Sequence, residues 1–255
     1  MNTEIHFGNR IDAYRESMIR DLAKLIAIPS VCSEPDGALP YGKASAEALD
    51  CVLNLAKEMG FSTFNADHYA GHAEYGEGEE IAAILTHVDV VPVGAGWNTD
   101  PFTLTQKGDL LFGRGTADDK GEAMAALYAL KALKDAGVTG KRRLRVIFGA
   151  GEEVGMEDLP HYFKSQPLPD YAFTPDAEYG ICNREKGILR IRVSGSASPA
   201  VQRFTGGTVV NAVPDHAEIV LNCSLEEAKA LSESSLPGKF TFAVSQNGVE
   251  ISSKG

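Results

Sequence analysis

A long apolar run between two turn-rich segments does most to limit the folds open to this chain. Residues Ile81–Val88 are almost all apolar, as in strands buried on both faces, and Leu144–Phe148 is a second such run. Between them, Glu122–Leu133 is rich in Ala, Leu and Met and predicts a helix. Parallel strands need a crossover of this kind, so the pattern predicts an α/β sheet with helices on its faces.

Weaker patterns extend this unit in both directions. Apolar residues at helical spacing predict helices over residues 11–28 and 43–59, and a short strand is expected over Tyr171–Thr174. After Arg184 the chain changes to alternating patterns that predict further strands and one helix. The strands are expected over Gly187–Val193 and Ala217–Asn222 and near Phe240 and Val249, and the helix over Leu225–Leu231.

Charge and composition limit the partners. The net charge of −11 disfavours nucleic acid and anionic membrane surfaces, because both need a basic patch, and a small-molecule or peptide substrate fits better. The four cysteines show no C-x-x-C pair that would predict a disulfide framework or a structural zinc site. Neither an apolar leader over Met1–Arg10 nor a run of about 18 apolar residues is present, so a cytoplasmic protein is expected.

Acidic residues and one histidine follow the ends of the predicted strands. His87 and Asp89 end the first apolar run, Glu152 and Glu153 follow the second after three small residues, and Asp176 follows the strand at Tyr171. Ligands of open α/β sheets bind outside the carboxyl ends of the strands. We therefore expect these side chains to gather at one edge of the sheet.

A further acidic pair, Asp118-Asp119, precedes the crossover helix. Taken singly, each of these motifs has an ordinary explanation: a structural His–Asp pair, a solvated Glu-Glu, or acidic residues at a helix N-terminus. Taken together, several carboxylates beside an imidazole repel one another unless a cation lies among them. The set therefore predicts a site for a divalent metal ion.

Five segments carry a family resemblance. They are Thr86–Val93 (THVDVVPV), Trp97–Phe102 (WNTDPF), Gly113–Gly121 (GRGTADDKG), Gly151–Gly155 (GEEVG) and Thr174–Tyr179 (TPDAEY). They resemble the dinuclear zinc exopeptidases that include dipeptidase V, carnosine-hydrolysing dipeptidases, glutamate carboxypeptidase G, aminoacylase and succinyl-diaminopimelate desuccinylase. The chain looks closest to the dipeptidase V branch, and the resemblance covers nearly all of it.

The resemblance implies a fold and a set of metal ligands. The expected fold is a three-layer α/β catalytic domain of the zinc exopeptidase type over residues 1–183, followed by part of an α+β lid domain over 184–255. His87 and Asp176 would bind one zinc ion, Glu153 the other, and Asp118 would bridge both. Relatives have a cis peptide bond after the bridging aspartate, so a strained bond is expected between Asp118 and Asp119.

The resemblance also implies a reaction. Asp89 would hold the second imidazole nitrogen of His87, and Glu152 would be the general base for a metal-bridging hydroxide that hydrolyses the peptide bond of dipeptides. Asn211 resembles a residue of the lid domain that contacts the substrate, although a polar turn residue is the alternative. Zinc is the expected metal, with manganese or cobalt as alternatives.

The chain departs from the family pattern near its C-terminus. Relatives continue with a lid histidine and a last zinc-ligand histidine, and neither is present, so we expect a C-terminally truncated enzyme with reduced or no activity. The remaining histidines are expected to be exposed or bonded locally, with His68 or His72 the best candidates to replace the missing ligand. The remaining histidines are His6, His68, His72, His161 and His216.

Two other functions stay open at this stage. A related amidohydrolase acting on N-acyl amino acids would use the same residues. A non-catalytic fragment that binds metal or a partner, such as a complementary C-terminal chain, is the second alternative. Retention of Glu152 speaks against the fragment, because binding alone needs no general base.

Overall fold

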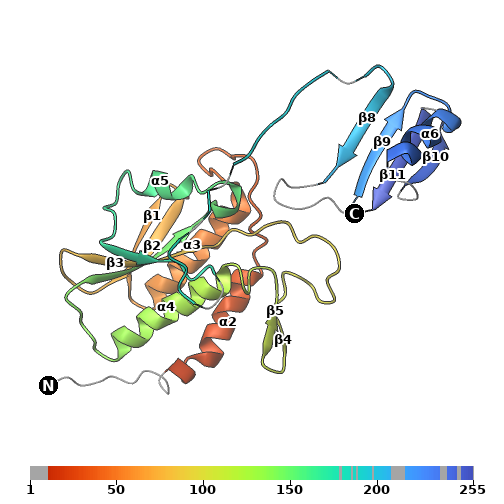
Figure 1. Ribbon diagram of the computed structural model, residues 1–255. Coiled ribbons are helices and arrows are strands. Elements are labelled where there is room, and N and C mark those ends of the chain that lie inside the picture. Colours follow the sequence, from red (N-terminus) through yellow and green to blue (C-terminus); the bar gives the residue numbers. More distant parts are fainter. Residues whose placement is uncertain are drawn as a thin grey trace. The chain divides into compact units, whose positions relative to one another are not determined.

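The computed structural model of the 255-residue chain forms two compact units, residues 1–182 and 183–255, which are described separately (Figure 1). The structure describes residues 11–177, 180–184, 186–187, 189–196, 198–207, 216–235, 240–245 and 248–254.

The first unit is built on a five-stranded mixed sheet with the order β1-β2-β6-β3-β7. Its strands are β1 (Ser62–Ala66), β2 (Ala70–Tyr75), β3 (Ile81–His87), β6 (Arg143–Gly149) and β7 (Tyr171–Phe173). Strand β3, next to the edge strand β7, runs parallel to both β6 and β7, whereas β2 runs antiparallel to the central strand β6. The carboxyl ends of three strands therefore meet at one edge of the sheet, as the apolar runs predicted.

Helices cover the two faces of this sheet unequally. Figure 1 shows α2 (Arg15–Ile26), α3 (Lys43–Glu58) and α4 (Lys120–Asp135) together on one side of the sheet and the short α5 (Asp158–Tyr162) on the other. No helix within the described ranges is long and apolar enough to cross a membrane. The prediction of an α/β sheet between helical layers is confirmed.

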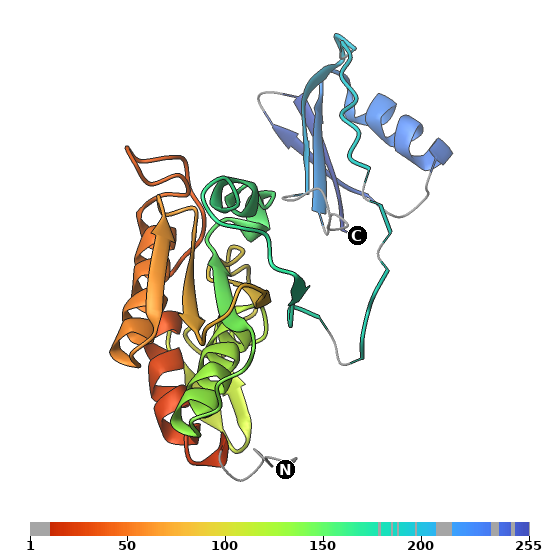
Figure 2. The ribbon, with the colours of Figure 1, turned by 90° about the vertical axis from the view of Figure 1, so that its left-hand side faces the viewer.

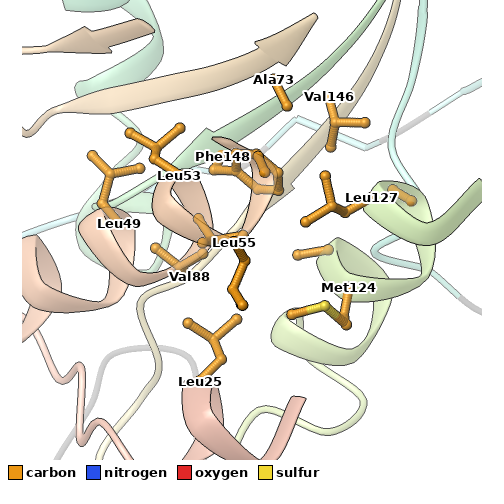
Figure 3. Close-up of a cluster of buried hydrophobic side chains, with 14 of the residues drawn as sticks. Leu25, Leu49, Leu53, Leu55, Ala73, Val88, Met124, Leu127, Val146 and Phe148 are labelled. Atoms are coloured by element: carbon orange, nitrogen blue, oxygen red, sulfur yellow. The ribbon is translucent and has the colours of Figure 1, made fainter. Parts of the chain in front are cut away.

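Side chains on alternate positions of β6 divide the core between the two faces. Val146 and Phe148 pack against α2, α3 and α4, where Leu25, Leu49 and Leu127 are buried (Figure 3). Ile147 points to the opposite face and packs in a second cluster that includes Tyr162 of α5. This alternation follows from the two-residue period of a strand, and it explains why the run is apolar on both faces apart from Arg145.

One side of the sheet, along its outermost strand β7, is open to solvent. β7 is an edge strand, and its Tyr171 and Phe173 are 56% and 61% exposed. A separate two-stranded sheet, β4 (Thr105–Lys107) and β5 (Leu110–Phe112), lies in the segment between β3 and α4.

The second unit holds a four-stranded sheet, with the order β10-β11-β9-β8, and one helix (Figure 2). Its elements are β8 (Val201–Gly206), β9 (His216–Leu221), α6 (Leu225–Ser235), β10 (Thr241–Ser245) and β11 (Gly248–Lys254). Leu221, Ala228, Val249 and Ile251 form its small core.

The strand expected over Gly187–Val193 is wrong. The described residues of this segment form no strand, and Leu189, Ile191 and Val193 are 82%, 74% and 90% exposed. The alternating pattern is present, but no described strand pairs with the segment, and a strand exists only through the bonds to its neighbour.

A buried polar cluster joins β2, β6 and α5 in the first unit. His72 is 6% exposed, and its Nδ1 lies 2.6 Å from the Tyr162 hydroxyl, which accepts a hydrogen bond from Arg145 at 3.0 Å. Arg145 also donates to Glu74 at 2.8 Å, and Phe64 stacks on the imidazole. Burial, with the nearby Arg145 and Arg143 adding to it and Glu74 opposing it, lowers the pKa of His72 from 6.5 to about 4.

This cluster predicts acid-sensitive stability. The folded chain keeps His72 neutral, whereas the unfolded chain binds a proton at His72 below pH 6.5. The contribution of neutral His72 to the free energy of unfolding is therefore complete above pH 6.5 and is lost as the pH falls toward 4. The loss is expected to reach about 3 kcal/mol. Denaturant unfolding of the wild type and His72→Gln from pH 7.5 to 4.5 measures it, with His161→Gln as the control. Equal pH slopes for the wild type and His72→Gln would contradict the assignment.

Candidate metal centre

The site residues of the first unit come from segments that follow parallel strands. His87 ends β3, and Asp89 lies two residues beyond it. Glu152 and Glu153 begin the 3₁₀ turn η1 (Glu152–Val154) after β6, and Asp176 follows β7. Strand direction thus brings these segments to the same edge of the sheet, as expected for parallel strands.

His87 lies at the centre of the cluster. Its side chain is buried, and Nε2 is 3.0 Å from Oδ1 of Asp118 and 3.6 Å from Oδ2 of Asp176. Its Nδ1 lies 3.1 Å from the backbone carbonyl oxygen of Asp89 and 3.2 Å from Oδ1 of the same residue. Asp89 therefore faces one ring nitrogen, and two carboxylates face the other.

The two adjacent aspartates point in different directions. The peptide bond between Asp118 and Asp119 is cis, as the resemblance implied. Asp118 faces the imidazole with a partly exposed side chain, whereas the fully buried Asp119 accepts the backbone N–H of His87 at 2.9 Å. Next in sequence, buried Lys120 donates to the carbonyl oxygens of Leu25 and Ile28, which ties the start of α4 to the end of α2.

The arrangement of Glu153 tests whether a metal ion fits here. Ligand atoms of His87, Asp118 and Glu153 all lie within 4.8 Å of one another. Oε1 of Glu153 is buried and has no hydrogen-bond partner among the described residues. Burial and then the charge of Asp118 raise the pKa of Glu153 to about 7. One imidazole with carboxylates suits zinc or a similar divalent ion, so the donor set fits a metal.

Glu152 lies beside this group without belonging to it. It is partly buried, and its backbone N–H donates to Oδ1 of Asp89 at 3.2 Å. Burial raises the pKa of its carboxyl group, with Asp89, Asp176 and Asp118 acting in the same direction and His87 against them. A carboxylate in such surroundings holds a proton more readily than one in water.

Sequence reasoning missed Glu122 as a member of the cluster. Its Oε2 is buried without a hydrogen-bond partner in the described structure, and the charges of Asp176 and Asp118 raise its pKa after burial does. It lies in the first turn of α4, four residues after Asp118, and an acidic residue so close to the Asp-Asp pair was the available signal.

Other predicted residues lie elsewhere. His68 contacts Asn65, His72 contacts Tyr162, and His161 contacts Asp67, so none of the three is in the described cluster. His216 begins β9 in the second unit. Asn211 and His6 lie outside the described residues.

Comparison with known families decides the classification. The model of peptidase family M20/M25/M40 matches residues 83–251, which include every candidate ligand. The chain belongs to this family. The family resemblance expected from the motifs is confirmed, and the narrower place in the dipeptidase V branch stays a prediction.

Curated M20 relatives are about twice as long as this chain. It is 40% identical over 216 residues to "Putative dipeptidase YtjP" of Bacillus subtilis (strain 168), which covers 81% of this chain and 47% of that protein. It is 38% identical over 219 residues to "Putative dipeptidase SAUSA300_1697" of Staphylococcus aureus (strain USA300), covering 82% and 47%. The chain thus spans about half the length of these relatives.

Solved structures show the same fold. Human carnosine dipeptidase 1 superimposes with a TM-score of 0.58 at 22% identity, over 67% of this chain and 40% of that one. The di-peptidase Dug1p from Saccharomyces cerevisiae gives a TM-score of 0.53 at 21% identity, over 61% and 36%. At these identities the likeness concerns the fold alone.

Proposed function

We propose that this chain carries the catalytic centre of a zinc-dependent dipeptidase. The observation that supports the proposal best is the group of His87, Asp118 and Glu153, whose ligand atoms lie within 4.8 Å and whose Glu153 oxygen lacks a partner in the described structure. Family membership supports a peptidase, and the names of the M20 relatives support dipeptides as its substrates.

The ligands divide between two zinc ions in this proposal. His87 and Asp176 would hold the first, Glu153 would hold the second, and Asp118 would be a ligand shared by both. Zinc bound there would supply Lewis-acid chemistry, polarising the scissile carbonyl and making water more acidic. Asp89 fixes the orientation of the imidazole through the contact with Nδ1.

Glu152 performs the proton transfers. It accepts a proton from the attacking water as the new carbon–oxygen bond forms. It then donates that proton to the amine nitrogen as the carbon–nitrogen bond breaks. A partly buried carboxylate suits both transfers, because burial raises its pKa above that of an ordinary glutamate and so helps it to hold the proton between the two steps.

The second unit has a role of its own in the proposal. In the proposal, residues 1–183 are the catalytic domain, residues 184–255 are part of an α+β lid domain, and Asn211 would contact the substrate. A complementary C-terminal chain and the metal alternatives, manganese and cobalt, stay predictions.

Metal removal tests the reaction and its substrate class together. Removal of metal from the purified chain with a chelator is expected to abolish hydrolysis of a dipeptide panel, and added Zn²⁺ is expected to restore it. The reason is that the proposed reaction depends on the zinc held by His87 and the carboxylates. N-acetyl amino acids, assayed in parallel, are expected to react at least about tenfold more slowly. Faster hydrolysis of the acylated compounds would favour the amidohydrolase alternative. Zinc binding without any hydrolysis would agree with the reduced activity expected of this chain, and a chain that binds no zinc would contradict the proposed metal centre.

A further inference from the structure

The loop that carries Glu152 and Glu153 is held by its backbone. Three successive peptide N–H groups donate to buried carboxylates: Gly151 to Oδ2 of Asp158 at 3.0 Å, Glu152 to Oδ1 of Asp89 at 3.2 Å, and Glu153 to Oδ2 of Asp89 at 3.1 Å. Hydrogen bonds to ionised acceptors are stronger than those between neutral groups. The loop therefore has an unusually well-anchored backbone.

Asp158 connects this loop to the far face of the sheet. It begins α5 and is 1% exposed, and its other oxygen accepts the N–H of Leu159 at 2.8 Å. A buried carboxylate is costly unless its oxygens are hydrogen-bonded, and both oxygens here accept backbone N–H groups. Its position is thus fixed by α5 at one end and by Gly151 at the other.

Neighbouring contacts leave the loop little other freedom. The ring of Tyr41 lies against Gly151 and leaves no room for a side chain there. The preceding carbonyl oxygen, that of Ala150, accepts hydrogen bonds from Ser45 and Cys32. These contacts hold the chain before Gly151, and Asp158 holds the N–H of Gly151 itself.

The geometry points to Asp158 as a positioning residue for Glu152 and Glu153. Its bond to Gly151 fixes the direction in which the chain enters η1, and hence where the two glutamate side chains reach the cluster. Small displacements at a reacting centre cost activity, and groups that orient metal ligands typically change affinity or rate by about 10–100-fold. The catalytic consequence rests on the function proposed above, whereas the hold on the loop does not.

Asp158→Asn tests this role with three measurements. The variant keeps the shape but sets an amide NH₂ against one of the two N–H groups. Hydrogen exchange of the peptide covering Gly151–Glu153 is expected to speed up about tenfold while β3 stays unchanged. The zinc dissociation constant is expected to rise about tenfold and kcat to fall about tenfold, with KM within about twofold.

Asp21→Asn is the matched control, because Asp21 is also a buried hydrogen-bonded aspartate but lies on α2 and contacts Tyr128 and Lys24. It is expected to lower thermal stability without changing exchange in the loop or zinc affinity. Should Asp158→Asn fail to fold, Asp158→Ser retains a hydroxyl for Leu159 without reaching Gly151.

Two outcomes would overturn the inference. One is unchanged exchange and zinc affinity in a folded Asp158 variant, and the other is faster exchange spread evenly over the first unit. A wild-type chain that binds no zinc would contradict the proposed function instead, and hydrogen exchange would still decide the role of Asp158.

Discussion

Glu152→Gln is expected to lower the rate of dipeptide hydrolysis by about 10²–10⁴-fold, the usual contribution of a general acid–base group. Glutamine has nearly the same shape but cannot accept the proton of the attacking water. The backbone bond from residue 152 to Asp89 does not involve the side chain, so the loop stays in place. Zinc affinity is therefore expected to stay within about twofold of the wild type, as measured by competition with a chromophoric chelator.

Glu157→Gln provides the control for this variant. Glu157 lies on the same loop, and its side chain is exposed. Its replacement is expected to leave hydrolysis unchanged. If Glu152→Gln kept wild-type turnover, Glu152 would not be the proton acceptor, and another carboxylate of the cluster, such as Glu122, would have to be tested.

Glu153→Gln and Asp118→Asn are expected to weaken zinc binding by more than about 100-fold, beyond the 10–100-fold typical of groups that only orient a ligand. Each change replaces a charged oxygen by a neutral amide while it keeps the side-chain shape. In the wild type, burial and then the charge of Asp118 raise the pKa of Glu153, so its ionised form needs a bound cation, and glutamine cannot ionise at all. Isothermal titration with Zn²⁺ measures the loss directly.

The stability of the same two variants, measured with and without zinc, separates metal ligands from ordinary surface acids. Without zinc, Glu153→Gln is expected to be at least as stable as the wild type, because it removes like-charge repulsion within the cluster, whereas Asp118→Asn also weakens the contact with His87. With zinc in excess, the wild type gains stability in proportion to its affinity, and the variants gain little. A wild-type chain that zinc does not stabilise, or variants stabilised equally, would count against these ligands.

The parts of the fold that the sequence predicted are those with strong, uninterrupted patterns. Ile81–Val88 and Leu144–Phe148 pack on both faces of the sheet, so these runs are mostly apolar and the strands are evident. β1 and β2 were missed, because their residues are mixed and the strands depend on pairing with each other and with β6. Gly187–Val193 shows the opposite error: its pattern alternates, but no described strand pairs with it.

The candidate site follows the same rule. Strand ends and their direction were enough to place His87, Glu153 and Asp176 at one edge, and the motif pointed to Asp118. Glu122 was missed because its approach depends on the direction of a helical side chain. Asp158 was missed because it accepts a hydrogen bond from a backbone N–H, and the sequence does not show which backbone N–H a carboxylate will bind.

Zinc-edge anomalous diffraction from crystals of the zinc-loaded chain tests the central claim most directly. We predict that anomalous density lies between the Nε2 atom of His87 and the carboxylates of Asp118, Glu153 and Asp176, with zinc-to-ligand distances of about 2.0–2.2 Å. Zinc density elsewhere, such as at the surface pair of His161 and Asp67, or no density near His87, would contradict the assignment of the metal centre.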